Sequence, residues 1–250
     1  GGVFIPQDHI TLNANNRTYK TYGLLRVNGS GSKYGYWADL NIGGTLSAAI
    51  AENGGMITAG NLIIGGNRGT PAAPCSNCVA RADNGMIELT GGLNVGTANA
   101  ECYRPELRIT GTNGLVRAIG SGKVSSLYEN IGATIALEIP AEGFADTNGT
   151  ARAPIHLNAL QSVARGAGLA DFGATTLELT ARDWVKANPK KTVKLVELVT
   201  ANAPVLTNLM NSAVFTDTSD KTCPVLSVSG DGKVLSATAP VWPGFIILFR

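Results

Sequence analysis

The stretch "NLIIGG" at Asn61–Gly66 recurs in slightly different forms, as "DLNIGG" at Asp39–Gly44 and as "GLNVGT" at Gly92–Thr97. The copies begin 22 residues apart (39 to 61) and 31 residues apart (61 to 92). Recurrence at a spacing of about 20–50 residues is typical of proteins built from stacked structural repeats. The repeated stretch therefore predicts a repeat architecture.

A second stretch recurs between the copies of the first, as "NGGMITA" from Asn53, "NGMIELT" from Asn84 and "NGLVRAI" from Asn113. These copies begin 31 residues (53 to 84) and 29 residues (84 to 113) apart. Asn and Gly at the start of each copy indicate a sharp turn, because both residues tolerate a left-handed backbone. We interpret the series as one repeat with a period in the twenties, lengthened by insertions.

Each repeat contains three short segments with the character of strands, for example Gly85–Leu89, Gly92–Gly96 and Glu106–Thr110. Strands this short gain partners when equivalent strands of successive repeats stack in parallel, about 4.8 Å apart. The sequence therefore predicts an all-β protein, a right-handed parallel β-helix; a β-sandwich with coincidental similarity is the alternative. Alternation along the strands predicts an inward ladder of four side chains, Leu62, Ile64, Leu93 and Val95.

The same alternation predicts an apolar row on the outside of the protein, formed by Met56, Met86 and Leu115. A contiguous apolar row is normally covered, so these residues are candidate interface residues. We expect the cover to be a later segment, with "GFIILFR" at Gly244–Arg250 as a candidate, or a second copy of the molecule. The alternative is a local bulge that turns the methionines inward.

Three later segments favour short helices by the spacing of their apolar residues. They are 154–168, in which Ile155 and Leu160 lie near one helical face, Asp183–Ala187 and Pro204–Met210. Apolar and alternating segments between them indicate that the coils continue. We expect one domain over residues 1–250, with a cap and first coil at 1–38, the clearest repeats at 39–122, and irregular coils and a C-terminal cap at 123–250.

The units "NLIIGGN", "NGMIELTGGLNVGT" and "PELRITGTNG" resemble the Gly-rich repeats of autotransporter-associated and related secreted bacterial β-helix proteins. The resemblance covers about Leu24–Gly122. It implies an exported, passenger-like protein that is secreted or lies at the cell surface, and it carries no catalytic residues. The chain begins with Gly1 rather than Met, which fits removal of a leader or trimming of the chain.

The composition permits a buried core and excludes several partners. The 250 residues are 44% apolar and 15% charged, and no window is long and apolar enough for a membrane-spanning helix. The formal charge is +2, and Lys190–Lys191 is the longest basic run, so we expect no nucleic-acid partner. Glycine-rich segments do not open a helix after a strand, so no cofactor is expected.

The four cysteines are Cys75, Cys78, Cys102 and Cys223, an even number that fits an exported protein with disulfides. The repeat places Cys75 and Cys102 at similar positions in successive coils, so we predict that Cys102 bonds to Cys75 or, second, to Cys78. "CSNC" is also a spacing found in metal and redox sites, but a zinc site would need further ligands that the nearby sequence lacks. We assign no metal site.

Few residues on the predicted outer faces have charged side chains. The charged outward positions are Arg81, Asp83, Glu88, Arg108 and Arg117. The repeat register puts Thr58, Glu88 and Arg117 in one column, which favours a surface ion pair over a catalytic set. Three aromatic residues either pack under the first coil or stack on a glycan: Tyr34, Tyr36 and Trp37.

No catalytic residue is therefore assigned, and three functions compete. The first is a non-enzymatic extracellular structural or adhesive module, which repeats without a convergent polar site favour. The second is a glycan-binding or polysaccharide-cleaving β-helix. The third is a self-assembling filament or coat subunit. Surface glycans and other copies of the chain are the expected partners.

Overall fold

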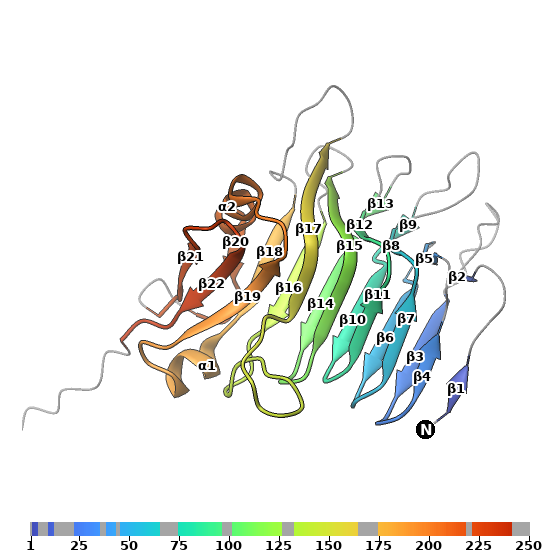
Figure 1. Cartoon of the computed structure of the whole chain (residues 1–250), viewed down its shortest axis with the longest axis horizontal. Helices are drawn as coiled ribbons and strands as arrows, with labels where there is room; N and C mark the ends of the chain where they lie inside the picture. Colours follow the sequence, from blue (N-terminus) through green and yellow to red (C-terminus); the bar gives the residue numbers. More distant parts are fainter. Residues whose placement is uncertain are drawn as a thin grey trace, which may run out of the picture.

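The computed structural model describes residues 2–4, 10–12, 23–35, 39–43, 46–65, 75–96, 102–126, 133–164, 175–218 and 222–241. These residues form mainly β-strands, and most neighbouring strands pair in parallel. The strands lie side by side along the long axis of the molecule, in the order of the chain from blue to red (Figure 1). The all-β prediction is confirmed at this level.

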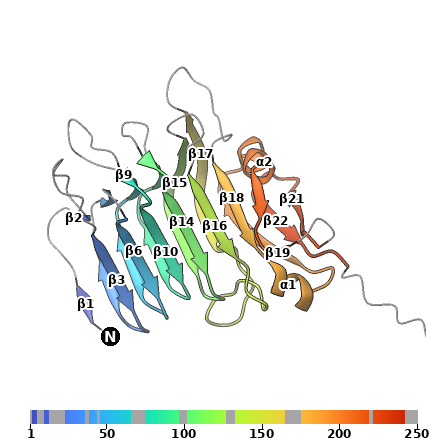
Figure 2. The same ribbon diagram turned by 180° about the vertical axis from the view of Figure 1, so that it is seen from behind.

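One face is a parallel sheet whose strands come from successive repeats, with no register shift between any two of them. Figure 2 shows these strands side by side from behind. In spatial order the seven strands are β3 (Leu24–Asn28), β6 (Ala48–Glu52), β10 (Val79–Asp83), β14 (Glu106–Thr110), β16 (Thr134–Glu138), β18 (Thr176–Thr180) and β20 (Ala213–Phe215).

The next strand of each repeat belongs to a second sheet, again paired in parallel with its equivalents. These strands are β1 (Val3–Phe4), β4 (Lys33–Gly35), β7 (Met56–Ala59), β11 (Met86–Leu89), the first part of β15 (Leu115–Ser126), the first part of β17 (Ile155–Ala164) and β19 (Thr192–Leu198).

The third strands stack in the same way and join the second sheet through the long strands β15 and β17. They are β2 (Ile10–Leu12), β5 (Leu40–Ile42), β8 (Leu62–Ile64) and β12 (Leu93–Val95). A separate parallel pair is formed by β9 (Cys75–Ser76) and β13 (Cys102–Tyr103). Three successive repeats, β3–β5, β6–β8 and β10–β12, thus each contribute three strands that stack in parallel on their equivalents, whereas in the next two repeats one long strand, β15 or β17, takes the place of the second and third strands.

Asparagines at the ends of β3, β6, β10 and β14 bond in pairs between neighbouring repeats. Asn53 and Asn84 adopt left-handed backbone conformations, with φ of 52° and 48°. The Asn53 Nδ2 group donates to Asn28 Oδ1 at 3.1 Å, and the Asn113 amide donates to Asn84 Oδ1 at 3.2 Å. The recurring Asn therefore turns the chain and links its own repeat to a neighbouring one.

The first residues of the recurring "NLIIGG" stretch form a second line of hydrogen bonds. The Asn61 Nδ2 group donates to Asp39 Oδ1 at 2.6 Å, and the Gly92 amide donates to Asn61 Oδ1 at 2.6 Å. The backbone that follows pairs in register, Leu62 with Leu93 and with Leu40. The repetition in sequence is thus explained by contact between equivalent positions.

The core lies between the stacks and consists of columns of equivalent apolar side chains. The predicted inward ladder is confirmed, because its members pair in parallel and none is more than 3% exposed. Burial of each such side chain contributes about 1.5–3 kcal/mol. Two adjacent columns are Leu40, Leu62 and Leu93, and Ile42, Ile64 and Val95.

The C-terminal end departs from the repeat. β19 pairs in antiparallel fashion with β22 (Val234–Thr238), which pairs with β21 (Val225–Val228). The helices α1 (Arg182–Ala187) and α2 (Ala203–Asn211) agree with the two short helices predicted in this region. α2 places Val205, Leu206 and Leu209 against the core.

The predicted helix over 154–168 is wrong for its described part, which is the strand β17. This strand pairs in parallel with β15, and Ile155, Leu157 and Leu160 are buried. A short apolar run does not distinguish the period of a strand from that of a helix. Here the open edge of β15 supplies hydrogen-bond partners for the backbone of β17, and this pairing favours a strand over a helix.

Candidate functional site

The outward positions of the seven-stranded sheet concentrate charge. Side chains alternate along each strand, so that Ala80, Ala82, Leu107 and Ile109 enter the core and their neighbours face outward. The outward residues that we call the charged face are Arg26, Glu52, Arg81, Asp83, Glu106, Arg108, Glu138 and Glu178. With three arginines and five carboxylates, this face has an excess of negative charge.

The arginines of the charged face are paired with carboxylates. Arg26 Nε donates to Glu52 Oε1 at 2.6 Å between adjacent strands. Arg81 Nη2 donates to Asp83 Oδ2 at 2.6 Å within β10. The hydrogen bond to Glu52 raises the pKa of Arg26 above its ordinary value. These contacts neutralise the N-terminal part of the charged face.

The C-terminal part of the charged face is more acidic. Arg108 Nε donates to a carboxylate oxygen of Glu106, and this bond raises the pKa of Arg108, helped by the charges of Glu178 and Glu138 and opposed by burial. In the ladder, Ala136 pairs with both Arg108 and Glu178. Glu138 and Glu178 form no ion pair with any residue that the structure describes.

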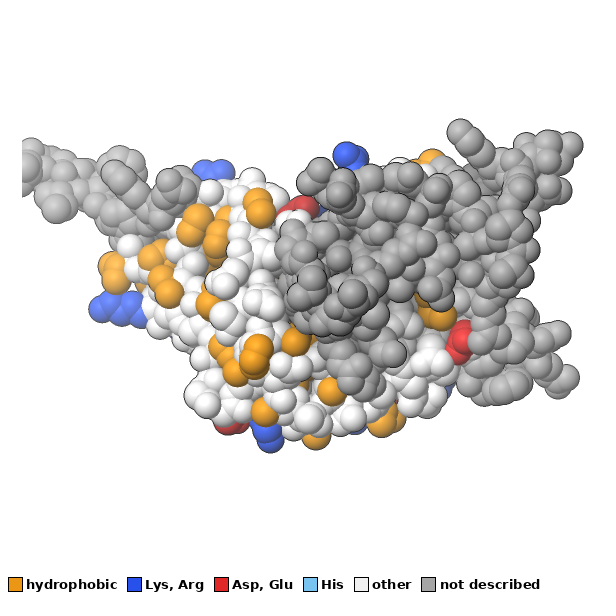
Figure 3. Space-filling view, turned by 90° about the horizontal axis from the view of Figure 1, so that it is seen from above, with side chains coloured by type: hydrophobic (Ala, Val, Ile, Leu, Met, Phe, Trp, Pro, Cys, Tyr) orange, Lys and Arg blue, Asp and Glu red, His pale blue; other side chains and the backbone are white. Residues whose placement is uncertain are grey.

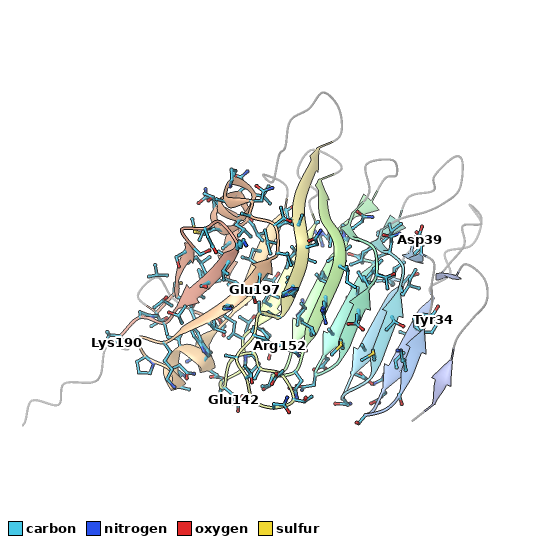
Figure 4. The ribbon with its side chains drawn as sticks, in the orientation of Figure 1. Tyr34, Asp39, Glu142, Arg152, Lys190 and Glu197 are labelled. Carbon is cyan, nitrogen blue, oxygen red and sulfur yellow. The ribbon has the colours of Figure 1, made fainter. Side chains whose placement is uncertain are left out.

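A charged column crosses the second sheet. The register confirms that Thr58, Glu88 and Arg117 stack in one column, and it extends the column to His156 and Glu197. The Arg117 Nη1 and Glu88 Oε1 atoms are 3.6 Å apart, and His156 Nδ1 lies 3.9 Å from Glu197 Oε2. Figure 4 shows Glu197 on β19. Arg117 and Glu88 thus form a surface ion pair, as the sequence favoured.

A loop over residues 139–154 borders this column and is held by Arg152 (Figure 4). Arg152 Nη2 donates to the Asn113 carbonyl oxygen at 2.9 Å. Burial lowers the pKa of Arg152, and the charge of Asp146 opposes that shift. Asp146 itself accepts hydrogen bonds from the Asn148 and Thr150 amides at 2.8 and 2.9 Å. These contacts fix the loop against the asparagine turn of the preceding repeat.

Of the three aromatic residues proposed for glycan stacking, the structure describes only Tyr34. Tyr34 is only 2% exposed and pairs in β4 beside Ile57, so its ring belongs to the core (Figure 4). The prediction of Tyr34 as a glycan-binding residue is corrected, because inward alternation buries it. Tyr36 and Trp37 lie outside the described residues.

The predicted outer apolar row has the expected register. Met86 pairs with Met56 on one side and with Leu115 on the other. Both methionines are half-buried, whereas Leu115 is only 6% exposed. From above, the hydrophobic side chains of the described residues lie in separate small groups (Figure 3). The proposed covering segment Gly244–Arg250 lies outside the described residues.

The cysteines are divided between the core, the C-terminal region and the pair β9–β13. Cys78 is fully buried, and its Sγ atom lies 3.9 Å from the Ser76 carbonyl oxygen. Cys223 Sγ lies 3.2 Å from Thr218 Oγ1. The backbones of Cys75 and Cys102 are described, but their side chains are not. Among the residues that the structure describes, no group of three or more His, Cys, Asp or Glu side chains could hold a metal ion.

The sequence placed Arg81, Asp83 and Arg108 on the outer face, but the other members of the charged face were not identified from it: Arg26, Glu52, Glu106, Glu138 and Glu178. Glu138 and Glu178 went unnoticed, although alternation in "ATIALEI" and "TTLELT" signals that these glutamates face outward. The approach of Glu197 to His156 had no local signal, because 41 residues (156 to 197) separate them.

Comparison of the chain with models of known families, with characterised proteins and with solved structures found no match. Within the described part of the chain, no helix is long and apolar enough to span a membrane.

Proposed function

We propose that the chain is a right-handed parallel β-helix that serves as a non-enzymatic structural or adhesive module, secreted or at the cell surface. The observation that carries this proposal is the continuous register of the seven-stranded sheet, from β3 to β20. Six strand spacings of about 4.8 Å give a regular face about 29 Å long. Stacked repeats of this kind provide extended surfaces for binding or for spacing other groups apart.

The ion pairs support the same role. Arg26 with Glu52, and Arg81 with Asp83, use their charges to join neighbouring positions of the sheet. Side chains held in such pairs contribute to a regular surface. The resemblance of the repeats to those of secreted bacterial proteins supports the extracellular location.

A glycan-cleaving β-helix is the second candidate, and one observation favours it. Glu178 pairs with Ala136, so that Glu138 lies two residues along the neighbouring strand. Glycosidases act with two carboxyl groups on either side of the scissile bond. Glu138 and Glu178 are the two carboxylates of the charged face that form no ion pair with its arginines.

Protease treatment and antibody labelling of intact source cells test the location. We expect the protein to be found in the culture medium or to be labelled and digested on intact cells, and detection only after lysis would contradict the proposal. Release of reducing ends from a panel of acidic and neutral polysaccharides tests the activity. We expect none, whereas release by the wild type that Glu178→Gln abolishes and Arg26→Gln preserves would establish the glycan-cleaving function instead.

A further inference from the structure

The short strand pair β9–β13 brings two cysteines to equivalent positions in successive repeats. Cys102 is the direct backbone partner of Cys75 in this parallel pair. Neighbouring strands lie about 4.8 Å apart, and the Cα atoms of a disulfide are about 4.4–6.8 Å apart. We propose that Cys75 and Cys102 form a disulfide bond that ties one repeat to the next.

The backbone also distinguishes Cys75 from Cys78. Val79 pairs with Glu106, and the Glu106 amide donates to the Cys78 carbonyl oxygen at 2.9 Å. Cys78 is therefore aligned with the start of β14, three or four positions beyond Cys102, and its side chain lies in the core. Cys223 follows β20, which lies three strands beyond β14 in the seven-stranded sheet.

The bond forms by thiol–disulfide exchange with an external disulfide of the glutathione class. One cysteine thiolate attacks that disulfide and releases one glutathione thiol. The second cysteine thiolate then attacks the mixed disulfide, forms the Sγ–Sγ bond and releases the second thiol. Two protons and two electrons thus leave the cysteine pair, and the electrons reduce the external disulfide. In the source organism, this step rests on the extracellular location proposed above, because the cytosol keeps thiols reduced.

Peptide mapping of the full chain, incubated with oxidised glutathione and then alkylated, tests the pairing directly. Trypsin cuts after Arg81 and so separates Cys102 from Cys75, but it leaves Cys75 and Cys78 in one peptide. Fragmentation between Ser76 and Asn77 must therefore assign the linked sulfur. We expect a Cys75–Cys102 link. A link through Cys78, a Cys75–Cys78 link, or alkylation of all four thiols would overturn the proposal.

Stability provides a second readout. The oxidised Cys75→Ser, Cys102→Ser and double variants should melt about 6–12 °C below the oxidised wild type, and by equal amounts, since each lacks the same bond. The difference in melting temperature should disappear when the wild type is reduced. A difference that persists under reduction would show that packing, not the disulfide bond, is responsible. Cys223→Ser is the matched control and should leave the Cys75–Cys102 link intact.

Different results would contradict the disulfide bond and the extracellular location. A pair that forms in the purified protein but is reduced in freshly alkylated material from its source would overturn the extracellular location and keep the pairing. A pair that never forms, in a protein that is labelled on intact cells, would overturn the disulfide alone.

Discussion

Replacement of Gly85 by alanine tests how closely successive repeats stack. Gly85 precedes β11, where its carbonyl oxygen accepts a hydrogen bond from the Leu115 amide at 3.0 Å. A Cβ atom at this position would lie 2.4 Å from both the carbonyl carbon and the oxygen of Ala51, and 2.7 Å from the Glu52 nitrogen. Because ordinary contact begins at 3.4 Å, the two repeats would have to separate by about 1 Å.

The clash is with backbone, which cannot rotate away as a flexible side chain can. We therefore expect Gly85→Ala to lower the free energy of unfolding by about 2–3 kcal/mol, in the upper part of the range for overpacking an interior. For a chain of this size, that corresponds to a fall of about 4–12 °C in the unfolding midpoint. Urea and thermal unfolding followed by far-UV circular dichroism measure both quantities.

Gly230→Ala is the matched control. A Cβ atom at Gly230 meets nothing within 4 Å, so the free energy of unfolding should change by no more than about 0.5 kcal/mol. If Gly85→Ala were as stable as Gly230→Ala, the close approach of the Gly85 turn to Ala51 would be refuted.

Three further substitutions test other contacts. Met86→Lys should leave the protein folded, because Met86 faces outward between Met56 and Leu115. Any self-association of the wild type, measured by sedimentation equilibrium, should be lost in this variant. If the variant unfolded, Met86 would instead lie in the core. Asp217→Ala should cost about 1–2 kcal/mol, because its carboxylate accepts from the Ala181 and Arg182 amides at 2.9 and 2.8 Å; an unchanged urea midpoint would contradict this. Ser229→Ala should raise the pKa of Asp231, measured by carboxyl carbon NMR, because the Ser229 hydrogen bond is the main cause of its lowered value. A carboxylate whose pKa is lowered in the folded state stabilises the protein fully at a pH above the ordinary aspartate pKa, and this contribution is lost as the pH falls. Ser229→Ala should therefore lose less stability in acid than the wild type. An unchanged pKa of Asp231 in this variant would contradict the role of Ser229.

The parallel stacking could be predicted because equivalent residues in neighbouring repeats contact one another. Asn53 and Asn84 occupy equivalent turns of successive repeats, and Leu62 and Leu93 occupy the same core column. The structural constraint on a residue in one repeat therefore recurs at the equivalent residue of the next repeat. Repetition turns a contact between distant residues into a pattern that is visible in the sequence.

Where the repeat ends, local sequence no longer determines the outcome. The apolar run beginning at Ile155 suits a helix or a strand, and the exposed edge of β15 selects the strand. The antiparallel pairing of β19 with β22 has no repeated counterpart from which to infer it. The burial of Tyr34 required its exact register against Ile57, which the irregular first repeat did not reveal.

The charged face was predicted only in part, and Arg26, Glu52 and Glu106 were not identified although they lie within the repeats. Arg81, Asp83 and Arg108 lie in the clear repeats and were placed outward from the sequence. Glu138 and Glu178 join them only because β16 and β18 continue the sheet beyond those repeats. A group of charges gathered from several strands depends on the stacking order, which composition does not contain.

Successive repeats stack in parallel and in register, and methyl–methyl nuclear Overhauser effects test this stacking most directly. Leu62 pairs with Leu93, and Ile64 pairs with Val95. With specific methyl labelling, we predict strong cross-peaks within each of these two pairs, because in-register partners lie about 4.8 Å apart. Strong cross-peaks that instead join Leu62 to Val95 and Ile64 to Leu93 would show antiparallel pairing and would contradict the account.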